Sequence, residues 1–161
     1  MSIEHENNID ICDIAADQAD ELLKLDNQLC FAFYVCSKEI IKKYRPLLSP
    51  FGLTYTGYIA MLALWEKDNV MVKELGERLY LDSGTLTPLL KKLEELGYIR
   101  RLRSESDERN VYVVLTDKGR ELKKEAAQVP LKLAGSLGCG MKRAGEVLEQ
   151  LRYMMKLITE E

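Results

Sequence analysis

The stretch that decides the fold is VMVKELGERLYLDSGTLTPLLKKLEELGYIRRLRSESDERNVYVVLT, from Val70 to Thr116. Its apolar residues recur at helical spacing at first and then, after Gly97, alternate as they do in β-strands. The pattern predicts helices at 73–79 and 83–96 and a two-stranded β-ribbon at 98–103 and 110–115. Two short helices followed by a ribbon form a winged helix-turn-helix, a unit whose second helix typically enters the major groove of DNA.

Helical spacing also covers most of the chain outside this stretch. A long helix is expected at 20–44, with Asp26 or Asn27 as an alternative internal start, and Pro46 should end or kink it. Further helices are expected at 55–67 after the N-cap Thr54 and over most of 116–161 after the N-cap Thr116, with breaks near Pro130 and 135–140. Residues 70–72 fit either a single short strand or the lead-in to a helix. The predicted fold class is therefore mainly α with a small β-ribbon.

The outer helices carry more apolar surface than one DNA-binding lobe can bury, and a symmetric dimer would cover it. We therefore expect a winged helix-turn-helix flanked by N- and C-terminal dimerisation helices, and a homodimer. The expected organisation is an acidic, partly ordered leader at 1–20 and a single domain at 21–161, with a DNA-binding lobe at 70–116 and a dimerisation region at 21–48 plus 120–161.

The charge of the chain is unevenly distributed. Residues 1–28 hold eight acidic side chains and one basic side chain, whereas the rest of the chain holds 22 basic and 18 acidic side chains. The formal net charge of −3 therefore conceals a mildly basic body. An acidic total does not exclude nucleic acid as a partner when the acidity is confined to one end.

Cysteine and histidine usage argues against a metal centre. The four cysteines form no C-x-x-C pair and the one histidine is His5, whereas a zinc site needs clustered ligands. We expect no metal and no cofactor. The N-terminus lacks the basic and apolar regions of a signal peptide, and no apolar stretch is long enough to cross a bilayer. These features indicate a cytoplasmic protein with no membrane partner, in which the cysteines remain thiols.

Polar and basic side chains on the second helix and the ribbon are the candidate DNA contacts. Hydroxyl side chains and free backbone N–H groups at a helix start can bind bases or phosphates. Lysines one to two turns later would lie near phosphates, and an arginine at a ribbon tip suits the narrow minor groove. The candidates are Ser83, Thr85, Thr87, Lys91, Lys92, Arg101 and Arg109. A solvated surface helix and hairpin would explain any one of them but not their order, which predicts double-stranded operator DNA as the partner.

The run from Val72 to Leu122 resembles the MarR family of regulators. The resemblance is carried by a wing tip with the sequence D-E-R at 107–109, followed by L-T-x-x-G at 115–119. The runs LDNQLCFAFY, YRPLL and GLTYTGY, which lie between residues 25 and 58, are similar to the organic-hydroperoxide-sensing subgroup of that family. The resemblance implies a dimeric regulator that is not an enzyme. It also implies that Asp82 pairs with Arg109 and so anchors the wing.

The same resemblance implies that Cys30 is a peroxide-reactive thiol. Tyr44 and Tyr55 match tyrosines that hydrogen-bond the sulfur in the family, and Tyr34, one helical turn from Cys30, matches another tyrosine of that pocket. A thiolate is the nucleophile, and its oxidation gives a sulfenic acid that a second thiol can convert to a disulfide. Either Cys139 or a small cellular thiol would be that second thiol.

Three functions remain open from the sequence. The first is a repressor that releases operator DNA when an organic hydroperoxide oxidises Cys30. The second is a repressor of the same fold that responds to a small aromatic acid. The third is a thiol peroxidase, which is disfavoured because no arginine lies near Cys30 in the sequence to activate the peroxide. The ordinary alternative for a single cysteine on an amphipathic helix is that it packs as a small buried apolar side chain.

Overall fold

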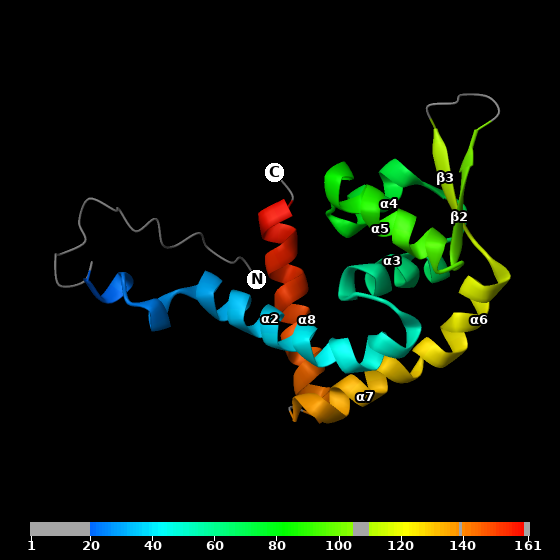
Figure 1. The fold of residues 1–161 in the computed structure, drawn as a ribbon. Coiled ribbons are helices and arrows are strands. Elements are labelled where there is room, and N and C mark those ends of the chain that lie inside the picture. The colour runs from blue at the N-terminus through cyan, green and yellow to red at the C-terminus, as the bar shows by residue number, and fades with distance from the viewer. Residues whose placement is uncertain (1–19, 105–109, 139, 160–161) are drawn as a thin grey trace, which may run out of the picture. The chain divides into compact units, whose positions relative to one another are not determined.

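The computed structural model describes residues 20–104, 110–138 and 140–159. The chain divides into two compact units, the first ending at Ile40 and the second beginning at Ile41, and each is described by itself. The structure confirms a mainly helical fold with a small antiparallel sheet (Figure 1). The helices are α2 (Leu29–Leu48), α3 (Tyr55–Glu66), α4 (Val72–Leu79), α5 (Ser83–Glu95), α6 (Asp117–Ala126), α7 (Gln128–Leu137) and α8 (Gly140–Thr159), with 3₁₀ turns η2 (Leu25–Asn27) and η3 (Ser49–Phe51). The strands are β1 (Val70–Met71), β2 (Ile99–Arg103) and β3 (Val111–Leu115).

The first unit contains η2 and the first part of α2. The sequence predicted a long helix here, with Asp26 or Asn27 as an alternative internal start; the structure has η2 at this place, and α2 begins at Leu29. The side-chain amide of Asn27 donates to the carbonyl of Glu21 at 2.7 Å, and that of Gln28 donates to the carbonyl of Leu22. Such bonds offer the backbone carbonyls a partner other than the next helical turn, which explains the break.

The second unit begins within α2, which continues through Pro46 and ends at Leu48. Of the two outcomes predicted for Pro46, ending the helix is wrong, and a kink there stays a prediction. The side chain of Leu48 is only 1% exposed. Burying a leucine stabilises a fold by roughly 1.5–3 kcal/mol, which favours keeping the last turn despite the hydrogen bond that Pro46 cannot donate. Gly52, with a φ of 67°, then reverses the chain after η3.

Helix α3 lies at the centre of the second unit. The side chain of Thr54 accepts a hydrogen bond from the N–H of Gly57 at 3.1 Å, which confirms Thr54 as the N-cap. Helix α3 is mostly apolar and partly or fully buried along its length, with Leu62 and Glu66 exposed. Its buried residues form one core cluster with residues of α5 and the sheet. The largest fully buried side chains of this core are Leu48, Tyr58, Met61, Leu64, Leu75, Leu90, Leu93, Ile99 and Val113.

The sheet has three strands rather than the two of the predicted ribbon. Its order is β1-β3-β2, so β3 is the central strand. Val113 of β3 pairs with Val70 of β1 on one side and with Arg101 of β2 on the other. The additional strand, β1, is only two residues long and is too short to show alternation in the sequence. Residues 70 and 71 are therefore a strand, and Val72 begins α4 directly after it.

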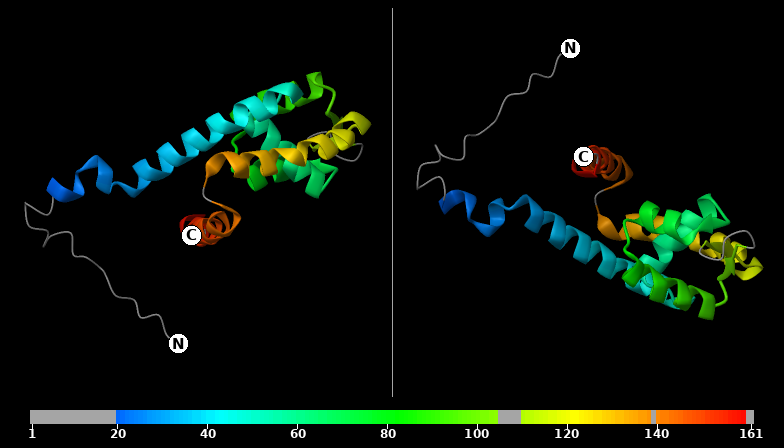
Figure 2. Two further views of the ribbon diagram at one scale, coloured as in Figure 1. Left: turned by 90° about the horizontal axis from the view of Figure 1, so that it is seen from below. Right: turned by 90° about the horizontal axis from the view of Figure 1, so that it is seen from above.

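The last three helices follow the sheet. Figure 2 shows α7 continuing on from α6. The break between them falls at Ala127, three residues before Pro130, because a proline ring clashes with the carbonyl four residues earlier, here that of Ala126. Gly138, with a φ of 67°, ends α7. Among the described residues no single helix is long and apolar enough to cross a membrane. The segment of α2 and η3 reaches that length and apolarity only together with α3, from which it is bent by 71°. Helix α3 belongs to the buried core.

Candidate functional site

The N-terminus of α5 is built by its capping residue, Asp82. The carboxylate of Asp82 accepts hydrogen bonds from the backbone N–H of Thr85 at 2.9 Å and from its hydroxyl at 3.0 Å. These bonds, the backbone one first, hold the pKa of Asp82 below its ordinary value. The helix therefore starts at Ser83, as predicted, and the hydroxyl of Thr85 is occupied by the cap.

The other predicted contacts of α5 face solvent. Ser83 and Thr87 are exposed and line a groove of about 980 Å³ between α4, α5 and the sheet. Lys91 is also exposed, and Lys92 forms an ion pair with Glu95 at 3.6 Å in which both side chains are more than half exposed. An exposed ion pair of this kind contributes at most about 1 kcal/mol, so Lys92 can exchange its partner at little cost.

Arg101, on β2, has partners that the sequence did not predict. Its Nε and Nη2 atoms donate to Oε2 of Glu94 at 3.0 and 2.7 Å, and its backbone N–H donates to Oε1 of the same carboxylate at 3.0 Å. The hydrogen bonds from Arg101 hold the pKa of Glu94 below its ordinary value. The sequence predicted Arg101 as a DNA contact, but the structure commits its side chain to the last turn of α5.

The base of the wing is tied closely to α6. The side chain of Thr116 donates to the carbonyl of Gly97 at 2.6 Å and accepts from the N–H of Gly119 at 3.0 Å, which confirms Thr116 as the N-cap of α6. Gly97 has a φ of 76°, as expected of the residue that follows a helix C-terminus. A Cβ on Gly119 would lie 2.1 Å from the carbonyl oxygen of Tyr98, so the L-T-x-x-G motif requires glycine for close backbone approach.

Two predicted site residues, Arg109 and Cys139, lie outside the described residues, as does the rest of the wing tip at 105–108. The pairing of Asp82 with Arg109 therefore stays a prediction. Among the described residues, the hydrogen-bond partner of the Asp82 side chain is Thr85 within its own cap. No group of three or more His, Cys, Asp or Glu side chains in the described ranges is arranged to hold a metal ion.

Cys30 lies in the first unit, in the first turn of α2, and its side chain is exposed. Tyr34, one turn later, is 60% exposed, and the ammonium of Lys38 lies 5.6 Å from the centre of its ring. Cys36 is exposed as well. Six residues of helix separate the two cysteines, which turns Cys36 by about 240° from Cys30, so the two thiols do not share a face of α2.

Tyr44 and Tyr55 meet in the second unit, where Tyr58 joins them. The ring centre of Tyr44 lies 4.9 Å from that of Tyr55 and 5.8 Å from that of Tyr58. Burial first, and then these two neighbours, raises the pKa of Tyr44 to about 12. Tyr44 is therefore a neutral phenol at physiological pH and can donate a hydrogen bond. Sequence reasoning missed Tyr58, although its position three residues after Tyr55 places both on one face of α3.

The comparison with known proteins identifies the family. A family model described as transcriptional regulator SarA/Rot matches residues 42–126, more than half of the chain. The chain belongs to the MarR/SarA family of transcriptional regulators. The organic hydroperoxide resistance transcriptional regulator of Bacillus subtilis (strain 168) is 47% identical to it over 138 residues, which cover 86% of this chain and 91% of the relative. The HTH-type transcriptional regulator SarZ of Staphylococcus aureus (strain USA300) is 48% identical over 128 residues, covering 80% and 86%.

Solved structures agree with this assignment. Reduced AbfR bound to DNA is 33% identical with a TM-score of 0.74, and the match covers 87% of this chain and 98% of AbfR. Overoxidised AbfR bound to DNA is 35% identical with a TM-score of 0.69 and similar coverage, 87% and 98%. MarR, at 18% identity and a TM-score of 0.72 over 83% and 98%, shows the same fold. The curated relatives are regulators and not enzymes, which removes the thiol peroxidase from consideration.

Proposed function

We propose that this regulator is a homodimeric, cytoplasmic repressor that binds operator DNA and releases it when an organic hydroperoxide oxidises Cys30. The observation that carries the DNA-binding part is the exposed N-terminal half of α5, with Ser83 and Thr87 at the groove beside the sheet. A helix of this kind in a winged helix-turn-helix is the one that enters the major groove. AbfR, which shares the fold, has been solved bound to DNA.

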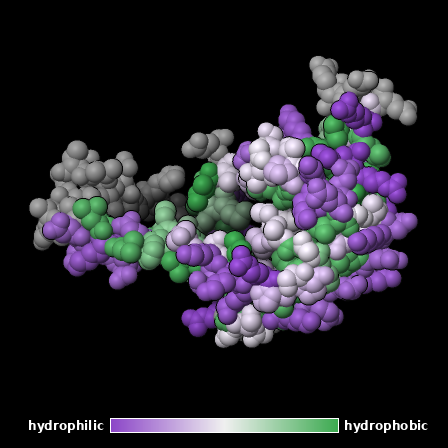
Figure 3. Space-filling model, in the orientation of Figure 1, coloured by the Kyte–Doolittle hydropathy of each residue, from purple (hydrophilic) through white to green (hydrophobic). Residues whose placement is uncertain are grey.

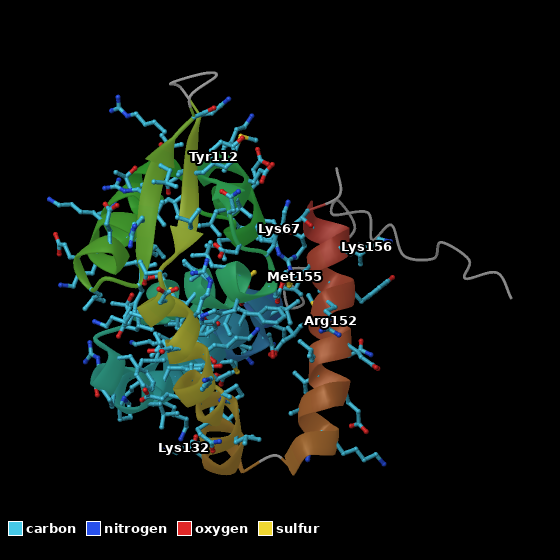
Figure 4. All side chains as sticks on the ribbon, turned by 90° about the vertical axis from the view of Figure 1, so that its right-hand side faces the viewer. Lys67, Tyr112, Lys132, Arg152, Met155 and Lys156 are labelled. Carbon is cyan, nitrogen blue, oxygen red and sulfur yellow. The ribbon has the colours of Figure 1, made fainter. Side chains whose placement is uncertain are left out.

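The homodimer is supported by apolar surface on the terminal helices. Large apolar side chains are exposed in the first unit (Figure 3) and along α8, where Met155 is one of them (Figure 4). They are Leu22, Leu23, Leu25, Leu29 and Val35 in the first unit and Val147, Leu148, Tyr153, Met155, Leu157 and Ile158 on α8. Exposed apolar side chains that gather on one surface mark an interface. A second copy of the chain would bury them in a symmetric dimer. Residues 21–48 and 120–161 are therefore the proposed dimerisation region, and 70–116 the DNA-binding lobe.

The redox part rests on the exposure of Cys30 and on the resemblance of its surroundings to peroxide sensors. The Cys30 thiolate attacks the outer peroxide oxygen, so that an S–O bond forms and the O–O bond breaks. Sulfur loses two electrons, and the alkoxide that leaves takes up a proton to become an alcohol. A second thiol, from Cys139 or a small cellular thiol, then displaces the hydroxyl as water and forms a disulfide.

We infer that the tyrosines which the resemblance assigns to the sulfur come from the second copy of the dimer. Cys30 and Tyr44 lie on the same helix, fourteen residues apart. A helix rises about 1.5 Å per residue, so about 21 Å of α2 separate them. A hydrogen bond from Tyr44 to the sulfur of its own chain would need α2 to unfold. We therefore propose that the donors are Tyr44 and Tyr55 of the partner subunit, with Tyr34 contributed by the same chain.

Selection from a random pool of DNA duplexes tests the DNA-binding part without knowledge of the target genes. The reduced protein should enrich a two-fold symmetric site with half-sites about one helical turn apart. Lys91→Ala should weaken binding and lower the slope of log K against log salt by about 0.9, because one phosphate contact is lost. Lys67→Ala, an exposed lysine outside both the proposed lobe and the dimerisation region, is the matched control and should change neither. Equal effects of the two substitutions, or no enriched duplex, would refute the assignment.

A further inference from the structure

The last turn of α5 holds an acidic side chain in an unfavourable place. Glu94 is the penultimate residue of the helix, where the carbonyl ends make a negative charge costly. In a repressor it would also lie on the helix that approaches DNA phosphates. A glutamate at this position therefore needs a compensating contact, and the structure shows one: all the described hydrogen bonds of its carboxylate come from Arg101.

The contact joins two different parts of the DNA-binding lobe. Helix α5 and strand β2 pack side by side (Figure 1), and β2 is an edge strand because the sheet order is β1-β3-β2. At Arg101 the backbone N–H points away from β3 and donates to Glu94 instead. The Glu94 carboxylate thus accepts a hydrogen bond from the edge-strand N–H that has no partner strand, and it also accepts hydrogen bonds from two nitrogens of the Arg101 guanidinium. Such forked pairs fix orientation as well as distance.

We propose that Glu94 and Arg101 are positioning residues for DNA binding, which clamp the wing strand to the recognition helix and so fix the direction in which the wing leaves the lobe. The inference rests on the proposed function and deepens it. The wing and α5 must contact one half-site together, and a wing that swings freely about its base loses that geometry. Arg101 then acts through the wing rather than by touching a phosphate, and the neutralised pair removes the repulsion between Glu94 and DNA.

Hydrogen exchange tests the clamp without DNA. In wild-type protein the backbone amide of Arg101 should exchange slowly, although it lies on an edge strand. Glu94→Ala should make that amide exchange at least about tenfold faster, since a hydrogen bond to a charged acceptor is lost. Arg100→Gln, whose exposed side chain lies on the opposite face of β2, is the matched control and should leave it protected. Equal exchange in wild type and Glu94→Ala overturns the inference and leaves the proposed function standing.

Binding to the selected duplex tests what the clamp does. Glu94→Ala and Arg101→Gln should each weaken binding by about tenfold, and the double variant should be no weaker than either, because each breaks the forked contact. Arg101→Lys keeps the charge but loses the fork, so it should bind as weakly as Arg101→Gln, with an unchanged salt slope. If Arg101 touched a phosphate instead, lysine would restore binding and Arg101→Gln would lower the slope by about 0.9. That result overturns the inference, whereas wild-type protein that binds no duplex overturns the proposed function.

Discussion

Replacing Gly119 by alanine should destabilise the protein strongly, because the backbone leaves no room for a methyl group. The added Cβ would lie 2.1 Å from the carbonyl oxygen of Tyr98 and 3.0 Å from its carbon. Non-bonded atoms are at their optimum near about 3.5 Å, so the start of α6 must retreat by roughly 1 Å. Overpacking of this kind costs about 1–3 kcal/mol.

The retreat also strains two hydrogen bonds at this joint. Trp65 Nε1 donates to the carbonyl of Gly119 at 2.8 Å, and Thr116 donates to the carbonyl of Gly97 at 2.6 Å. Each contributes about 1 kcal/mol, while alanine regains about 1 kcal/mol of helix propensity. The net loss is therefore about 2–4 kcal/mol, which lowers the Tm of a chain of this size by roughly 5–12 °C.

Thermal unfolding followed by circular dichroism measures this, at one protein concentration because a dimer's Tm depends on it. Gly135→Ala is the matched control, since a Cβ there meets no atom within 4 Å and α7 should keep or gain stability. A Tm for Gly119→Ala within about 2 °C of the wild-type value would refute the reasoning that close approach at Tyr98 requires glycine.

Two further predictions concern the tyrosine cluster and the wing tip. The pKa of Tyr44 is raised to about 12 in the folded protein against about 10 in an unfolded chain, so between these values the native state holds a proton that the unfolded state has lost. Stability should therefore be intact below pH 10 and fall as the pH rises towards 12, and urea unfolding of wild type against Tyr44→Phe should show a smaller fall in the variant. Arg109→Ala should weaken binding to the selected duplex and flatten its salt dependence by about 0.9 in slope; a gel-shift titration with unchanged affinity would remove Arg109 from the DNA interface.

Local signals in the sequence predicted most of the elements. The N-caps Thr54 and Thr116 and the helix C-terminus before Gly97 depend on bonds within a few residues, and all three are confirmed. For strand β1 the sequence left a strand and a helix lead-in open, because two residues show no alternation and their pairing with β3 depends on contacts distant in sequence. The break at η2 was predicted only as an alternative helix start at Asp26 or Asn27, because helical spacing carries no sign of the side chains that bind the backbone carbonyls there.

In the candidate site, too, local features could be predicted from the sequence and long-range contacts could not. The exposed hydroxyls of Ser83 and Thr87 follow directly from helix phase, so sequence alone placed them correctly on the surface. The partner of Arg101 could not be predicted, because Glu94 and Arg101 meet only after the chain reverses at Gly97 and β2 folds back along α5. No pattern in the sequence indicates that Glu94 on the helix would meet Arg101 on the following strand. Arg101 was therefore interpreted as one of several ribbon arginines available to DNA.

Release of DNA by peroxide, compared between two cysteine variants, tests whether Cys30 controls this regulator. Cys30 and Cys36 are both exposed on α2, so Cys36→Ser is a matched control for Cys30→Ser. The reduced proteins are bound to the selected duplex, treated with cumene hydroperoxide and followed by gel shift, with mass spectrometry of the treated protein to locate the oxidised sulfur. The account predicts that wild type and Cys36→Ser leave the DNA while Cys30→Ser stays bound. Release of Cys30→Ser by the same treatment would contradict it.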